Sequence, residues 1–230
     1  MTPWLKAYLG LVVFSLAGSL LSKATGLNPG FIAPAAGLLT IIAGVGAVFA
    51  GSFQKDTWKK TALLLAFVGL VGVTSEVAGL YTGVIFGPYE YTEKWWPTVL
   101  LPGDKPFPLL LPFAWMMMAG GAYLAVHRWM PDEKKWLAIP LGALLAAMVD
   151  LPMEWAMTGA LGYWVWTEPG PLPGGAPIMN FVGWVAVSAI AGALLYAGRA
   201  TDNRRYPEPV IVLGVHLIFT LFIGLIGAPT

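Results

Sequence analysis

The chain contains no cysteine, only two histidines and few charged residues. Without cysteine there is no disulfide, no thiolate metal site and no cysteine nucleophile. His127 and His216 are too few for a histidine-rich metal cluster, so we expect no metal and no metal-dependent chemistry. The 13 basic and 12 acidic residues give a net charge of +1, which provides no electrostatic surface for nucleic acid.

Charge is scarce because the chain is apolar. Charged residues make up 11% of the 230 residues and hydrophobic residues 57%, whereas a soluble domain has about 25% charged residues. This composition excludes a disordered chain, a coiled coil and an ordinary soluble enzyme. It predicts a multi-pass membrane protein, which we expect to form one integral membrane domain over residues 1–230.

A hydrocarbon core about 30 Å thick is crossed by about 20 apolar residues in a helix. Seven stretches of this kind predict an all-α polytopic bundle of about seven transmembrane helices. The stretches are 4–22, 31–51, 60–82, 107–129, 136–158, 178–198 and 209–227.

The basic residues of the loops predict how this bundle is oriented. Ten of the 13 flank the same side of the spans, which by the positive-inside rule puts the N-terminus in the cytoplasm of a cell membrane. They are Lys6, Lys55, Lys59, Lys60, Arg128, Lys134, Lys135, Arg199, Arg204 and Arg205. The two longest connections, 83–106 and 159–177, are then expected together at the outer face.

Three carboxylates lie inside predicted spans: Glu76 in the third, and Asp150 and Glu154 in the fifth. Inserting each of them into the bilayer costs about 2.5–3.5 kcal/mol, so carboxylates in such positions usually have a function. The alternative is a structural hydrogen bond that joins two helices. By the helix rise they lie about 24, 22 and 28 Å from the basic ends of their spans, at one depth under the long connections. Asp150 and Glu154 share a helix face, and Asn180 can add an amide at similar depth.

Two close carboxyl groups in an apolar pocket cannot both ionise at low cost, so one is expected to keep its proton at neutral pH. That proton can be delivered to an electron-rich carbon while the partner orients or deprotonates water. Aromatic rings nearby can stabilise the resulting carbocation, although tryptophan and tyrosine also collect at membrane interfaces. The candidates are Phe86, Tyr89, Tyr91, Tyr163, Trp164, Trp166 and Trp184. His216, in the middle of the seventh span, is interpreted as an interior histidine with its hydrogen bonds satisfied, the alternative being a ligand or a base.

Several blocks of the chain, in the same order, resemble the carotenoid hydratase family. They are EVAGLYTGVIFGPYEYT (76–92), PFAWMMM (112–118), DLPME (150–154), GYWVW (162–166) and GAPIMNFVGW (175–184). The resemblance implies a hydro-lyase without a cofactor that adds water to the terminal C1,2 double bond of an acyclic carotenoid end, giving a tertiary alcohol. The implied partners are water, the lipid bilayer and a carotenoid such as lycopene, γ-carotene or a bacterioruberin precursor.

Transferred onto this chain, the resemblance implies that Asp150 or Glu154 donates the proton and the other orients water, with Glu76 supporting the pair or replacing one member. Asn180 and Tyr163 are further candidates for holding water or the acid. A membrane lycopene cyclase is the nearest alternative, because Pro152-Met153-Glu154 is similar to its P-x-E motif. A proton-coupled transporter or a pigment-binding protein is a third interpretation. The oligomeric state is not predicted.

Overall fold

The computed structural model describes residues 1–28, 30, 32–52, 57–198 and 207–227. Outside the described residues lie four of the basic residues used for the orientation, Lys55, Arg199, Arg204 and Arg205, and residue 31 at the start of the second predicted span. The cytoplasmic placement of the N-terminus therefore stays a prediction.

In the part of the chain that the structure describes, six helices are long and apolar enough to cross a membrane. They are α1 (Pro3–Thr25), α2 (Ile32–Phe49), α3 (Trp58–Thr82), α6 (Ala138–Glu154) with its flanking turns, α7 (Ile178–Ala197) and α8 (Glu208–Gly227). A 3₁₀ turn, Asp132–Leu137, precedes α6, and a π-helical turn, Trp155–Ala160, follows it. The prediction of an all-α membrane bundle is confirmed, and the chain is a multi-pass membrane protein.

The fourth predicted span, 107–129, differs from the prediction. Its helical part is α4 (Leu111–Trp115), a π-helical turn (Met116–Gly120) and α5 (Gly121–His127), which follow one another directly. The predicted start was wrong, because Lys105–Pro108 forms strand β3. Its two prolines have no backbone N–H and cannot take part in the interior of a helix.

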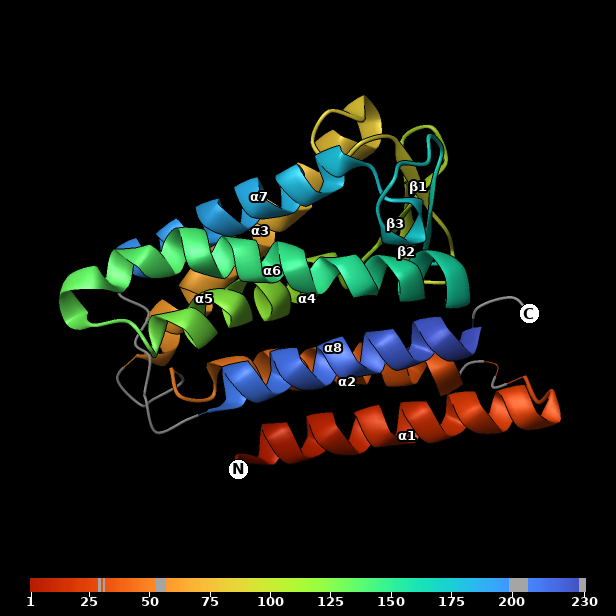
Figure 1. Cartoon of the computed structure of the whole chain (residues 1–230), viewed down its shortest axis with the longest axis horizontal. Helices are drawn as coiled ribbons and strands as arrows, with labels where there is room; N and C mark the ends of the chain where they lie inside the picture. The colour runs from red at the N-terminus through yellow and green to blue at the C-terminus, as the bar shows by residue number, and fades with distance from the viewer. Residues whose placement is uncertain (29, 31, 53–56, 199–206, 228–230) are drawn as a thin grey trace.

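Figure 1 shows the helices running along one long axis in layers. At one side, α1 packs against α2 and α8, and at the other side α3 and α7 lie together. The segments α4, α5 and α6 lie between these layers, and α6 packs most extensively against α7. These three segments therefore form the interior of the bundle.

Two short antiparallel ribbons, which the sequence analysis did not predict, lie at the end of the bundle opposite the N-terminus (Figure 1). Strand β1 (Tyr89–Tyr91) pairs with β4 (Trp164–Trp166), and β2 (Thr98–Leu101) pairs with β3. The first pairing brings the connections 83–106 and 159–177 together, as predicted. Along β1 the central residue is exposed and its two neighbours are buried, so one face of the β1–β4 ribbon covers the bundle.

Candidate active site

The inner face of the β1–β4 ribbon carries four aromatic side chains. Tyr89 lies opposite Trp166 and Tyr91 opposite Trp164, so all four share one face of the ribbon. The ring centroids of the two pairs are 5.5 Å and 6.3 Å apart, with the rings edge to face. Each of these rings carries a hydrogen-bond donor, which makes the face an array of donors directed toward the ends of α3 and α6.

The tyrosines of β1 donate to Glu76, near the end of α3. The hydroxyls of Tyr89 and Tyr91 each lie 2.6 Å from Glu76 Oε2. From α4, the indole N–H of Trp115 donates to Oε1 at 3.0 Å. Both carboxylate oxygens of this buried side chain are therefore engaged, and hydrogen bonds to a charged group are worth about 1.5–3 kcal/mol each.

The two tyrosines remain neutral donors. Burial raises the pKa of the Tyr89 and Tyr91 phenols, and the negative charge of Glu76 raises it further. Neither phenol ionises in the ordinary pH range, so the hydrogen bonds to Glu76 persist at neutral and mildly alkaline pH.

The tryptophans of β4 donate to Glu154, the last residue of α6. The indole N–H groups of Trp164 and Trp166 lie 3.0 Å and 2.9 Å from Glu154 Oε2. The Asn180 amide of α7 donates to Glu154 Oε1 at 3.0 Å. Glu154 is 2% exposed and, like Glu76, has both oxygens engaged by donors from neighbouring elements.

Asp150 lies one helical turn before Glu154 and shares the same amide. Asn180 Nδ2 donates to Asp150 Oδ2 at 2.8 Å, so one amide bridges the two carboxyl groups. Asp150 is fully buried, and its Oδ1 has no hydrogen-bond partner among the described residues. An ionised carboxylate with a bare buried oxygen is costly, so the pair of Asp150 and Glu154 is the part of the site that most easily keeps a proton.

Local backbone features place these side chains. Each π-helical turn begins directly after a residue of the site, Trp115 in one segment and Glu154 in the other. Such turns interrupt the α-helical register and are frequent at functional sites. At Gly72 on α3, a Cβ atom would lie 2.4 Å from the Trp115 ring, so the absence of a side chain there lets the indole reach Glu76.

A cavity of about 70 Å³, which we call the chamber, lies between these groups. One water needs at least about 10–15 Å³ of such a cavity, so the chamber can hold a few waters. Glu76, Glu154 and Asn180 line it together with an aromatic and methionine wall. That wall includes Phe86, Tyr89, Tyr91, Trp95, Trp115, Met117, Met118, Met153, Met157, Trp164 and Trp184.

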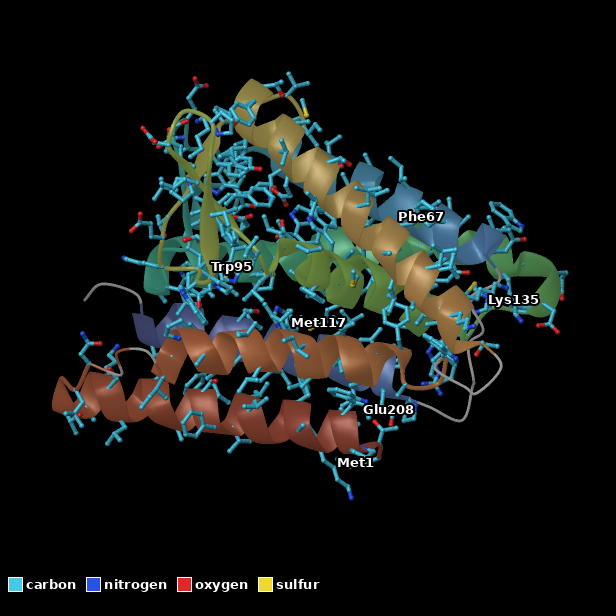
Figure 2. All side chains as sticks on the ribbon, turned by 180° about the vertical axis from the view of Figure 1, so that it is seen from behind. Met1, Phe67, Trp95, Met117, Lys135 and Glu208 are labelled. Carbon is cyan, nitrogen blue, oxygen red and sulfur yellow. The ribbon has the colours of Figure 1, made fainter. Side chains whose placement is uncertain are left out.

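A second cavity of about 650 Å³, which we call the large cavity, lies among α1, α2, α8 and the π-helical turn after α6. Its volume is that of a typical pocket for a sizeable organic ligand. The two cavities lie side by side, because five residues line both: Ile41, Trp95, Met117, Met157 and His216. Figure 2 shows Met117 in the middle of the bundle and Trp95 nearer the ribbons, which marks the position of this junction.

A family model described as carotenoid biosynthesis protein matches residues 36–229. The chain belongs to the carotenoid biosynthesis protein family. The matched region contains every residue that lines the chamber, whereas α1, which forms part of the wall of the large cavity, precedes it. Among curated proteins and solved structures no match was found. Family membership supports an enzyme of carotenoid biosynthesis with a carotenoid substrate in the membrane.

Most of the predicted residues lie at the chamber of this carotenoid biosynthesis protein. Glu76, Glu154 and Asn180 line it, as do five of the predicted aromatics: Phe86, Tyr89, Tyr91, Trp164 and Trp184. Trp166 contacts Glu154 from the ribbon, and Asp150 lies behind Asn180; neither is part of the chamber wall. Tyr163 lines the large cavity instead, where its ring stacks on Trp95 with centroids 5.5 Å apart.

The sequence analysis missed two residues of the site and misinterpreted a third. Trp115 and Trp95 were not singled out, although the block 112–118 contains Trp115. The interpretation of His216 as a satisfied histidine was wrong, since its Nε2 is buried without a hydrogen-bond partner in the described part of the chain. Within that same part, no group of three or more histidine, aspartate and glutamate side chains is arranged to hold a metal ion.

Proposed function

We propose that the protein is a carotenoid hydratase. It adds water to the terminal C1,2 double bond of an acyclic carotenoid end group by acid-initiated carbocation chemistry and forms a tertiary alcohol. One observation carries this proposal: Glu76 and Glu154 face one small aromatic chamber that adjoins a large cavity. An acid and a carboxylate in a chamber with room for a few waters, beside a cavity of ligand size, suit a reaction between water and the end of a lipid.

The large cavity supports binding of the polyene chain. Its walls from α2 and α8 are largely apolar, whereas α1 contributes three serines and Lys23 beside Phe14, and it has the size of a ligand pocket. The end group passes the junction at Met117 and enters the chamber, while the rest of the chain stays in the large cavity. Methionine suits such a passage because its unbranched, polarisable side chain adapts to a sliding ligand.

The first half of the reaction is protonation. Glu154 faces the chamber, so we assign it as the proton donor, and Asp150, which accepts from the same Asn180 amide, as a positioning residue that holds this amide. The π electrons of the C1,2 double bond form the new C–H bond at C2, which leaves a tertiary cation at C1. Glu76, as a carboxylate held by three donors, stabilises that cation, together with the π faces of the stacked Trp115 and Trp184 rings.

The second half is capture by water. The oxygen of a chamber water forms the C–O bond at C1, and its proton returns to the Glu154 carboxylate, so the acid is restored. The sum of the two steps is the addition of one water, without an oxidant or a reductant.

The test is expression in a host that accumulates lycopene or γ-carotene, followed by mass analysis of the pigments. A hydratase yields a pigment heavier by about 18 Da, the mass of one added water. A new pigment of unchanged mass would contradict hydration and favour a cyclase. An unchanged pigment set, with the protein present in the membrane, would contradict an enzyme acting on these substrates and favour transport or pigment binding.

A further inference from the structure

His216 is a buried polar side chain that the reaction above does not use. It lies on α8, is 8% exposed and lines both the chamber and the large cavity. Its Nε2 has no hydrogen-bond partner among the residues that the structure describes. The imidazole therefore presents a nitrogen without a hydrogen-bond partner where the two cavities adjoin.

The surroundings of this ring do not satisfy it. The other residues that line both cavities are Ile41, Trp95, Met117 and Met157, and the nearest ring is that of Phe219, at 6.4 Å between centroids. A buried polar atom left without a partner costs about 1–3 kcal/mol, a cost that one bound water removes. The chamber beside it has room for water, so a water at Nε2 satisfies the histidine without a protein partner.

We propose that His216 binds the water that adds to the substrate and thereby directs the reaction to hydration. This inference rests on the proposed function and names the residue that supplies its nucleophile. The substrate end group must pass the junction to reach Glu154, so its cation forms beside the water held at Nε2. The C–O bond forms at C1, and the water proton passes to the Glu154 carboxylate as before.

The consequence is a specific change in products when the histidine is removed. Without a held water, the cation still forms because Glu154 and Glu76 are untouched. It then loses a proton from a neighbouring carbon to Glu154, or bonds to a second double bond of the same chain and afterwards loses a proton. Both products are isomers of the substrate, with no added mass, and the acid is restored in each case.

The experiment uses the full chain in the pigment-accumulating host and compares wild type with His216→Leu and His216→Gln. The readout is the ratio of hydrated to isomeric pigment, normalised to the amount of protein in the membrane. Leucine keeps the size of the side chain but cannot bind water, so this ratio should fall about tenfold, the equivalent of one lost hydrogen bond. Glutamine can still bind water and should restore most of it.

His127→Leu is the matched control. His127 is also buried but lies on α5, with its ring 5.3 Å from that of Tyr123, and it is not part of the wall of either cavity. Its replacement should leave the product ratio unchanged, whatever it does to the amount of protein.

The outcomes separate the two proposals. A His216→Leu variant with the wild-type product ratio would overturn the role of His216 while leaving the hydratase intact. Equal loss of all products in the leucine and glutamine variants would assign His216 a purely structural role and would also overturn it. A wild-type protein that forms no hydrated pigment would overturn the proposed function itself.

Discussion

The two acidic sides of the chamber are built on one plan but differ in how many donors each carboxyl group receives. On the α3 side, Glu76 accepts hydrogen bonds on both oxygens from Tyr89, Tyr91 and Trp115. On the α6 side, Glu154 accepts from Trp164, Trp166 and Asn180, but its neighbour Asp150 accepts only from Asn180. Within the described residues, Asp150 Oδ1 is left with no donor at all.

This difference favours an ionised Glu76 on one side and a carboxyl pair that keeps a proton, Asp150 and Glu154, on the other. A single carboxylate with three donors is stabilised in its ionised form, whereas two neighbouring carboxyl groups with one bare oxygen between them retain one proton more easily. The same ribbon supplies both sides, with the tyrosines of β1 facing Glu76 and the tryptophans of β4 facing Glu154. One two-stranded ribbon thus defines an acid and a counter-charge across one chamber.

The largest effect on the rate of hydrated-pigment formation is expected from Glu154→Gln, which removes the group that we assign as proton donor. Glutamine keeps the size of the side chain and an oxygen that can accept from Trp164 or Trp166. The rate of hydrated-pigment formation should nevertheless fall about 10³-fold, within the range attributed to a general acid. Mass analysis of pigments against membrane protein content measures it.

Glu90 provides the control for that substitution. It lies on the same ribbon between Tyr89 and Tyr91, but its side chain is 59% exposed and points away from the chamber. Glu90→Gln should keep wild-type turnover. If Glu154→Gln were as active as Glu90→Gln, the assignment of Glu154 would be wrong.

A smaller effect is expected from Asp150→Asn, because Asp150 is not part of the chamber wall. The variant removes the carboxyl group that holds the Asn180 amide but leaves Glu154 in place. Turnover should fall about tenfold, roughly the effect of one or two kcal/mol of lost interaction. A loss as large as that of Glu154→Gln would instead mean that Asp150 itself protonates the substrate.

The helices and the depth of the acids could be predicted from the sequence, because both follow from distance along the chain. Apolar runs of about 20 residues define spans, and the rise per residue puts Glu76 and Glu154 at one level. The prediction was weakest near residue 107, where hydropathy alone did not separate strand β3 from the start of α4.

Contacts between distant segments could not be predicted in this way. The register of Tyr91 opposite Trp164 depends on a pairing across more than 70 residues, and short strands of three residues give no periodic signal. The same holds for Trp115, which reaches Glu76 only because α4 crosses α3 at Gly72. The unpartnered nitrogen of His216 is likewise a property of its neighbours and not of its residue type.

The smallest effect on turnover is expected from Tyr91→Phe, which removes one of the three hydrogen-bond donors to Glu76. The ring is kept, so its edge-to-face contacts with Tyr89 and Trp164 remain. Tyr89 still donates to the same oxygen, Glu76 Oε2, so turnover should fall only about threefold to tenfold, close to the value of one buried hydrogen bond.

Tyr89→Phe and the double variant extend this measurement. If the two hydroxyls act together on Glu76 Oε2, the double variant removes every tyrosine donor from that oxygen. Its loss should then exceed the product of the two single losses, because the first removal is compensated by the remaining donor. Losses that simply multiply would show that the tyrosines act independently, and the difference between the two acidic sides would then depend on Trp115 at Oε1.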